Sequence, residues 1–168
     1  MFSRVLFAII LSAFILNAQE FEVPKNYKLE KKEDYKPYEN DVLAAINFLE
    51  TSPFDKNIEK RKEVNAFLLK WMTGVPYVKI EMNSYVLEFT KKNKDFLMIF
   101  LGGWTRYALQ NPEGNNRFDG NLAGIQNIIN VYTTADGIKK DKKVEKLIKL
   151  QKKGELEKWL KETLERAE

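Results

Sequence analysis

The sequence contains no cysteine and no histidine among its 168 residues. Without cysteine, the chain cannot form a disulfide, a thiolate nucleophile, an iron–sulfur cluster or a zinc site with sulfur ligands. Without histidine, it has no Ser-His-Asp triad and no imidazole to act as an acid, a base or a metal ligand. The motifs GxxxxGK[ST], GxGxxG and GxSxG are also missing. Catalysis would therefore have to use carboxylates, lysines, tyrosines or arginines, and the sequence predicts a non-enzymatic protein.

Glycine and proline are scarce, with 8 and 5 residues, whereas hydrophobic residues make up 44% of the chain and charged residues 31%. This composition differs from that of disordered chains, which contain fewer aliphatic and aromatic residues. Chains of about 100–200 residues usually fold as one unit. We therefore expect one compact domain that is stabilised by packing and has no covalent cross-links.

The longest run of mostly apolar residues, 5–16, follows Arg4 at the N-terminus. A positive residue, an apolar stretch of about 7–15 residues and a small residue before the cut are typical of a secretory signal peptide. As a helix the run would reach about 18 Å, which is short of the roughly 30 Å hydrocarbon core of a bilayer. We expect residues 1–18 to be a signal peptide cleaved after Ala18, although Leu16 stands where a small residue is preferred. The alternative is an uncleaved anchor at the outer face of the inner membrane, and both interpretations predict an exported domain, periplasmic or extracellular.

The charge of the exported chain is only weakly positive. Loss of residues 1–18 removes one arginine and no acid, which leaves 27 − 24 = +3 from the 28 basic and 24 acidic side chains. This excess is too small to predict a nucleic-acid or membrane partner by itself. Lysines are frequent in 138–168, and a basic amphipathic helix can lie on an anionic surface. We expect membrane contact only through these Lys-rich C-terminal helices or through an uncleaved signal segment, and no nucleic-acid partner.

The chain after the signal peptide is expected to be all-α. Residues 19–38 form a charged arm, which we expect to be extended because Pro24 and Pro37 limit helix formation. Over 39–168, apolar residues recur at three- and four-residue spacing, which predicts a helical domain of six or seven short helices. The expected helices cover about 40–49, 55–73, 83–93, 95–110, 121–132 and two segments that divide at Gly154. Residues 78–82 alternate like a strand, but a lone strand has no partner, so we expect an extended connector.

The helix at about 95–110 is expected at the centre of the core, because residues 96–101 are apolar on every side. Two adjacent glycines, Gly102 and Gly103, each cost a helix interior about 1 kcal/mol relative to alanine. The favoured explanation is a tight crossing by another helix, or a kink. The functional alternative is a close approach of a ligand, with Trp104 as a stacking platform and Arg106 as a clamp for a carboxylate or phosphate.

Residues 111–120 form the densest cluster of turn residues. Alignment of Gly120 with the invariant glycine of a calcium-binding EF-hand loop places Arg117 and Gln126 where oxygen ligands belong, so we expect no metal and no cofactor. Partner contacts are expected near Trp104, Arg106 and the loop from 115 to 119. The candidate binding residues are Trp104, Arg106, Tyr107, Asn115, Arg117 and Asp119.

Several features resemble a family of small exported helical proteins of Bacteroidota that has no assigned activity. They are the segments KEVNAF (62–67) and LGGWTRYAL (101–109), the Ala-Gln-Glu boundary after the apolar run, and the excess of lysine over arginine. The resemblance implies export and transfers no catalytic residue. The leading hypothesis is a protein-interaction module with a partner protein in the cell envelope. The alternatives are a domain that binds a small ligand or lipid beside Gly102 and Gly103, and a carboxylate-based hydrolase of cell-envelope glycan.

Overall fold

The computed structural model describes residues 21–114 and 116–167, and the predicted signal peptide lies outside these ranges. The described chain is compact and all-helical, with seven α-helices, two short 3-10 helices and no strand, which confirms the predicted fold class. The α-helices are α1 (Glu39–Thr51), α2 (Ile58–Gly74), α3 (Ser84–Thr90), α4 (Phe96–Gln110), α5 (Arg117–Thr134), α6 (Lys142–Lys152) and α7 (Leu156–Glu165). Residues 78–83 form the expected connector without regular structure.

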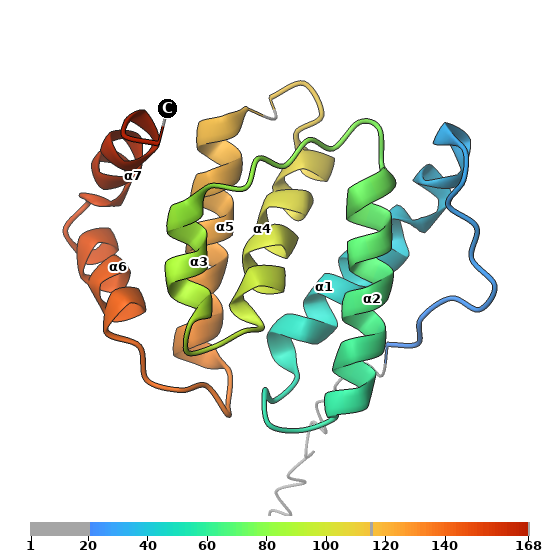
Figure 1. Ribbon diagram of the computed structural model, residues 1–168, viewed down its shortest axis with the longest axis horizontal. Coiled ribbons are helices and arrows are strands. Elements are labelled where there is room, and N and C mark those ends of the chain that lie inside the picture. The colour runs from blue at the N-terminus through green and yellow to red at the C-terminus, as the bar shows by residue number, and fades with distance from the viewer. Residues whose placement is uncertain (1–20, 115, 168) are drawn as a thin grey trace, which may run out of the picture.

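The helix α4 lies at the centre, as predicted. It runs alongside α5, and α1 and α3 also pack against it (Figure 1). Its large side chains Phe96, Phe100 and Trp104 are at most 1% exposed. The helix α4 is nevertheless not buried on every side, because Leu97 and Met98 are half-buried and line a hollow beside the start of α2.

Small residues allow α4 and α5 to pack closely. A Cβ atom on Gly103 would lie 2.6 Å from the Cβ atom of Asn127 and 2.8 Å from the backbone oxygen of Ala123. A Cβ atom on Gly124 would lie 2.6 Å from the ring of Phe100. Real Cβ atoms do not approach other heavy atoms this closely, which confirms the tight-crossing explanation for Gly103. At Gly103 the backbone of α4 therefore lies directly against the backbone of α5 at Ala123. A Cβ atom on Gly102 would lie 3.0 Å from the Ile46 side chain of α1.

The arm before α1 is not extended throughout, in contrast to the prediction. It contains two 3-10 helices, Lys32–Asp34 and Lys36–Tyr38. The Asp34 carboxylate accepts hydrogen bonds from the backbone N–H groups of Glu30 and Lys31 at 3.0 and 2.9 Å, which stabilises a turn there. Tyr35 is buried, and its backbone oxygen accepts a hydrogen bond of 3.0 Å from the Trp71 indole. The arm is thereby held against α2.

Two helix starts differ from the prediction. The helix α2 begins at Ile58, because Asn57 adopts a left-handed conformation with φ of 52°. Ile58 is 47% exposed and so does not belong to the buried stripe of α2. The helix α5 begins at Arg117 instead of after Gly120, because the Asn116 side chain accepts a hydrogen bond of 2.9 Å from the Asp119 N–H and caps the helix.

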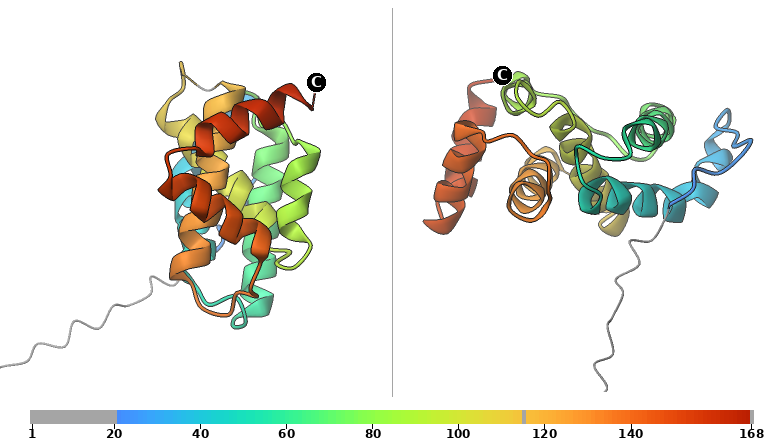
Figure 2. Two further views of the ribbon diagram at one scale, coloured as in Figure 1. Left: turned by 90° about the vertical axis from the view of Figure 1, so that its left-hand side faces the viewer. Right: turned by 90° about the horizontal axis from the view of Figure 1, so that it is seen from below.

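The last two helices form a hairpin. Figure 2 shows α6 and α7 packed against each other and against α5, at the edge of the molecule opposite to the N-terminal arm. Their buried side chains Val144, Leu147, Leu160 and Leu164 recur at the spacing that predicted both helices. Among the residues that the structure describes, no helix is long and apolar enough to cross a bilayer.

Candidate functional site

A shallow groove of about 300 Å³ lies over the seam between α4 and α5, and we call it the amide groove. Gly103 and Ala123 form its narrow floor, where the close packing of the two helices leaves no room for larger side chains. Its other lining residues are polar: Arg106, Tyr107 and Gln110 from α4, and Gln126, Asn127 and Asn130 from α5. Amide groups both donate and accept hydrogen bonds, whereas the arginine donates only. The groove therefore presents amide groups and a single cation beside the apolar parts of its lining side chains.

A carboxylate behind the groove orients two of these side chains. Glu50 of α1, whose side chain is 10% exposed, accepts a hydrogen bond of 2.6 Å from Nη2 of Arg106 and one of 2.7 Å from Nδ2 of Asn127. The Asn127 amide also donates to the backbone oxygen of Ile99 at 2.8 Å. Three helices thus meet at Glu50. Charge-assisted hydrogen bonds of this kind are short and directional, so Arg106 and Asn127 are fixed before any ligand arrives.

Arg106 keeps part of its hydrogen-bonding capacity. Its side chain is 29% exposed, and in residues 21–114 and 116–167 its Nε and Nη1 atoms make no hydrogen bond. A guanidinium held on one side by a carboxylate can bind a second acceptor with its other nitrogen atoms. The predicted role of Arg106 as a clamp is compatible with this geometry and stays a prediction.

The predicted role of Trp104 as a stacking platform is wrong. Its side chain is 1% exposed, and the indole packs against Gly120 of α5 and, edge-on, against the Phe100 ring at 6.0 Å between centroids. A buried ring has no free face for a ligand. Trp104 therefore helps to pack α4 against α5, next to the amide groove but outside it.

Tyr107 and Asp119 lie together, as the prediction of one site required. The Tyr107 hydroxyl contacts the Asp119 carboxylate at 3.2 Å and the Gly114 backbone oxygen at 3.3 Å. Burial raises the pKa of this hydroxyl, and the hydrogen bond to Asp119 raises it further, so Tyr107 stays protonated as a donor. Asp119 also accepts from the Asn116 side chain at 2.6 Å within the cap of α5. Asn115 lies outside the described residues.

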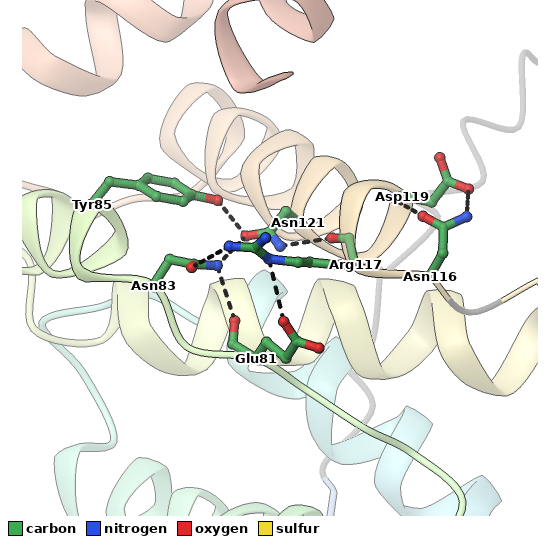
Figure 3. Close-up of polar contacts among 7 residues, drawn as sticks. All are labelled: Glu81, Asn83, Tyr85, Asn116, Arg117, Asp119 and Asn121. Atoms are coloured by element: carbon green, nitrogen blue, oxygen red, sulfur yellow. Dashed lines mark hydrogen bonds and ion pairs between the residues drawn. The ribbon is translucent and has the colours of Figure 1, made fainter. Parts of the chain in front are cut away.

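Arg117 points away from Asp119 and belongs to a separate network (Figure 3). Its Nη2 donates to Asn83 at 3.2 Å, and its Nε forms an ion pair with Glu81 at 3.2 Å. Asn121, which is fully buried, donates to the Arg117 backbone oxygen at 2.7 Å and accepts from the Tyr85 hydroxyl at 2.5 Å. The network joins the 78–83 connector and α3 to the start of α5. Its position indicates a structural role for Arg117.

No family model, no curated protein and no solved structure matches this chain. The resemblance to exported proteins of Bacteroidota therefore stays a prediction, and the site has to be interpreted from its own chemistry. Within 21–114 and 116–167, no three carboxylates lie close enough together to hold a metal ion.

Sequence reasoning named Arg106 and Tyr107, which both line the amide groove, but missed the other residues of the groove. Glu50 lies 56 residues from Arg106 and 77 residues from Asn127, and no local pattern connects them. Gln126 and Asn130 carry a weak signal, since they are polar positions one helical turn apart beside the apolar stripe of α5.

Proposed function

We propose that the protein is an exported, non-enzymatic interaction module and that its amide groove binds an extended segment of a partner polypeptide in the cell envelope. The observation that carries this proposal is the pair Arg106 and Asn127, which the half-buried carboxylate of Glu50 holds in place in a groove lined by amide side chains. Export is supported by the signal-peptide pattern of the first 18 residues.

The spacing of the groove residues suits a peptide backbone. Arg106 and Gln110 lie four residues apart on α4, as do Gln126 and Asn130 on α5, and each pair is separated by about 6 Å along its helix. An extended chain repeats its backbone donors and acceptors on one side about every 6.6 Å, which is two residues. Each wall of the groove can therefore bind successive backbone groups on one edge of an extended segment.

Small-ligand or lipid binding is the second candidate, and a different hollow favours it. This hollow, about 370 Å³, lies between the start of α5 and α7 and is lined by Phe118 and Leu164, with Arg117, Lys161 and Glu165 around them. Small-molecule sites are mostly apolar with a few polar groups, which describes this hollow better than it describes the amide groove. The hydrolase hypothesis has less support, because no carboxylate lines the amide groove in the described chain and Glu50 behind it is bound by Arg106.

Site-specific photo-crosslinking tests the proposal. A benzoylphenylalanine replaces Gln126 in the amide groove or, as the control, Gln151, which is exposed on α6. In cells that produce the protein, we expect position 126 to form a discrete adduct with a second polypeptide and position 151 to form none. Adducts at both positions, or at neither, would contradict the proposal.

A matched pair of triple variants tests whether the groove side chains make the contact. The first variant changes Gln110, Gln126 and Asn130 to alanine, and the control changes the exposed residues Asn40, Asn47 and Gln151. Surface changes of this kind alter the free energy of unfolding by about 0.5 kcal/mol or less, so both variants should fold. To quantify the contact, we place the photo-crosslinker in each variant at Tyr107, an aromatic residue that lines the same groove, and we expect the adduct to weaken at least tenfold in the first variant alone.

A further inference from the structure

Two lysine-rich segments meet at one end of the molecule. Residues 91–94 (KKNK) connect α3 to α4, and residues 139–143 (KKDKK) lead into α6, and all seven of their lysines are exposed. Although the segments are far apart in the sequence, they lie at the same end of the bundle (Figure 1). We call these seven lysines together the lysine face.

The side-chain amide of Asn93 joins the two segments through a pair of hydrogen bonds with the backbone of Lys139. Its amide nitrogen donates to the backbone oxygen of Lys139 at 2.9 Å, and its side-chain oxygen accepts from the backbone N–H of Lys139 at 2.9 Å. Asn93 is 7% exposed, so this contact is sheltered from water. The Lys92 ammonium also donates to the backbone oxygen of Lys140 at 3.3 Å. These hydrogen bonds hold the two lysine segments together although their lysines repel one another.

The acids near the lysine face do not neutralise it. Glu88 pairs with both Lys91 and Lys143, and Glu145 lies 3.8 Å from Lys140. Asp95 is bound to Arg61, and Asp141 is buried as the cap of α6. Asp55 and Asp136 lie at Gly137, beside the hollow between the two segments, and in the described chain neither forms an ion pair with a lysine of the face. Four lysines have no carboxylate within ion-pair distance in the described chain: Lys92, Lys94, Lys139 and Lys142. The face therefore carries a local excess of positive charge that the net charge of +4 conceals.

Apolar side chains adjoin these lysines. Lys94 borders two neighbouring hollows, one of about 320 Å³ between the two lysine segments and one of about 360 Å³ between the starts of α2 and α4. The second hollow contains the half-buried side chains of Leu97 and Met98 and the side chain of Ile58, which is 47% exposed. Lysines around exposed apolar groups are typical of surfaces that lie at the headgroup level of a membrane.

We propose that the lysine face docks on an anionic phospholipid surface. Charge complementarity supplies the attraction, and Ile58, Leu97 and Met98 supply apolar contact at the boundary between headgroups and acyl chains. A dissolved polyanion would satisfy the lysines but would leave these apolar groups in water. Docking is independent of the amide groove, which lies over α4 and α5 away from both lysine segments.

A single fluorescent label tests the orientation of the protein on vesicles. Because the chain has no cysteine, Lys140→Cys places one environment-sensitive probe on the lysine face, and Lys32→Cys places one on the N-terminal arm as the control. The exported protein, from which residues 1–18 have been cleaved, is mixed with vesicles of phosphatidylcholine, with or without one third phosphatidylglycerol. We expect brighter, blue-shifted emission from position 140 with phosphatidylglycerol only, and reversal near 1 M salt, where the screening length is about 3 Å. An equal response at both positions, or one that needs no anionic lipid, would overturn the proposal.

A charge-removal variant measures the strength of docking. Replacement of Lys92, Lys94, Lys139 and Lys140 by glutamine should weaken partition onto anionic vesicles by about fivefold per lysine, and so by more than about a hundredfold in total. The control variant removes four exposed lysines from the N-terminal arm, namely Lys25, Lys28, Lys32 and Lys36. Equal losses in the two variants would show that only net charge matters. Tighter binding to soluble polyphosphate than to vesicles would assign the face to a dissolved polyanion instead and would also overturn the proposal.

Discussion

Two arginines meet the last turn of α1, and their environments differ. Arg61 is 3% exposed and uses all three nitrogen atoms: Nη1 donates to the backbone oxygens of Leu49 and Ser52 and to the Ser52 hydroxyl, while Nε and Nη2 donate to Asp95. Arg106 is 29% exposed and donates only its Nη2 to Glu50 among the described residues. The guanidinium of Arg61, whose nitrogen atoms all donate hydrogen bonds, holds helices together. The guanidinium of Arg106 has donors left for a ligand.

The comparison shows how one residue type serves the fold in one place and a candidate site in another. Arg61 binds carbonyl oxygens at the C-terminal end of α1, which the helix itself leaves without partners. It also lies over the Phe54 ring, 4.3 Å from the centroid. Burial lowers the pKa of Arg61, and Asp95 partly offsets this effect, but an arginine stays charged at any physiological pH. The number of unused donors, more than the presence of a charge, distinguishes the two sites.

Removal of Arg61 should have the largest effect on stability. Arg61→Ala leaves the carbonyl oxygens of Leu49 and Ser52 and the carboxylate of Asp95 without their partner, so we expect a loss of about 3–5 kcal/mol in the free energy of unfolding. Chemical denaturation measures this loss, and Arg166→Ala, at the exposed residue that follows α7, serves as the control. A loss below about 1 kcal/mol would show that Arg61 is not the structural member of the pair.

The floor of the amide groove is the next most sensitive place. In Gly103→Ala the new Cβ atom meets Asn127 and the backbone of Ala123 in a packed seam, so we expect a loss of about 1–3 kcal/mol. Gly114→Ala is the matched control, because there the nearest atom lies 3.9 Å from the new Cβ. Thermal unfolding of the two variants measures the difference. Equal stabilities would mean that the seam can open without cost.

Much of the fold follows from local patterns, as particular residues show. The three- and four-residue spacing of Val144, Leu147, Leu160 and Leu164 predicts α6 and α7, because the same spacing places each set on one helix face. The early start of α5 was also readable, since Asn116 and Asp119 lie three residues apart, the spacing of a helix cap. Because residues 111–120 are rich in turn-forming residues, the sequence analysis interpreted the whole segment as a turn and missed the helix cap at Asn116.

The candidate site was less predictable, because its parts come from distant segments. An aromatic residue beside two glycines has the same sequence pattern whether it is exposed to a ligand or buried, and only the packing of Gly120 against Trp104 distinguishes these cases. Glu50 meets Arg106 and Asn127 through the crossing of three helices, and the angle of that crossing is not a property of any one helix.

The variant Glu50→Gln makes the two arginine sites more different, because it removes the charged partner of Arg106 and leaves Asp95 paired with Arg61. The amide can still accept from Asn127 but loses the ion pair, so we expect a loss of about 1–2 kcal/mol in unfolding free energy, less than for Arg61→Ala. Binding at the amide groove should weaken more than stability does, since Arg106 is no longer oriented. Crosslinking from position 126 measures the binding, and an undiminished adduct would exclude a role for Glu50 in orienting the site.

The exposed ion pairs of Glu88 with Lys143 and Lys91 are expected to contribute less to stability than either arginine site. Lys143 and then Lys91 hold the pKa of Glu88 at about 2, below its ordinary value of 4.5, so Glu88 binds fewer protons in the folded state than in the unfolded state. Its contribution to stability is therefore fully present above about pH 4.5 and is lost as the pH falls toward 2. The difference in melting temperature between the wild type and Glu88→Gln should shrink over this range, and thermal scans at a series of pH values measure it.

Because the ion pairs of Glu88 are open to solvent, the whole difference in melting temperature should be smaller than for either arginine site and should fall further with added salt. A difference that persists below pH 2 would mean that Glu88 acts through packing and not through charge.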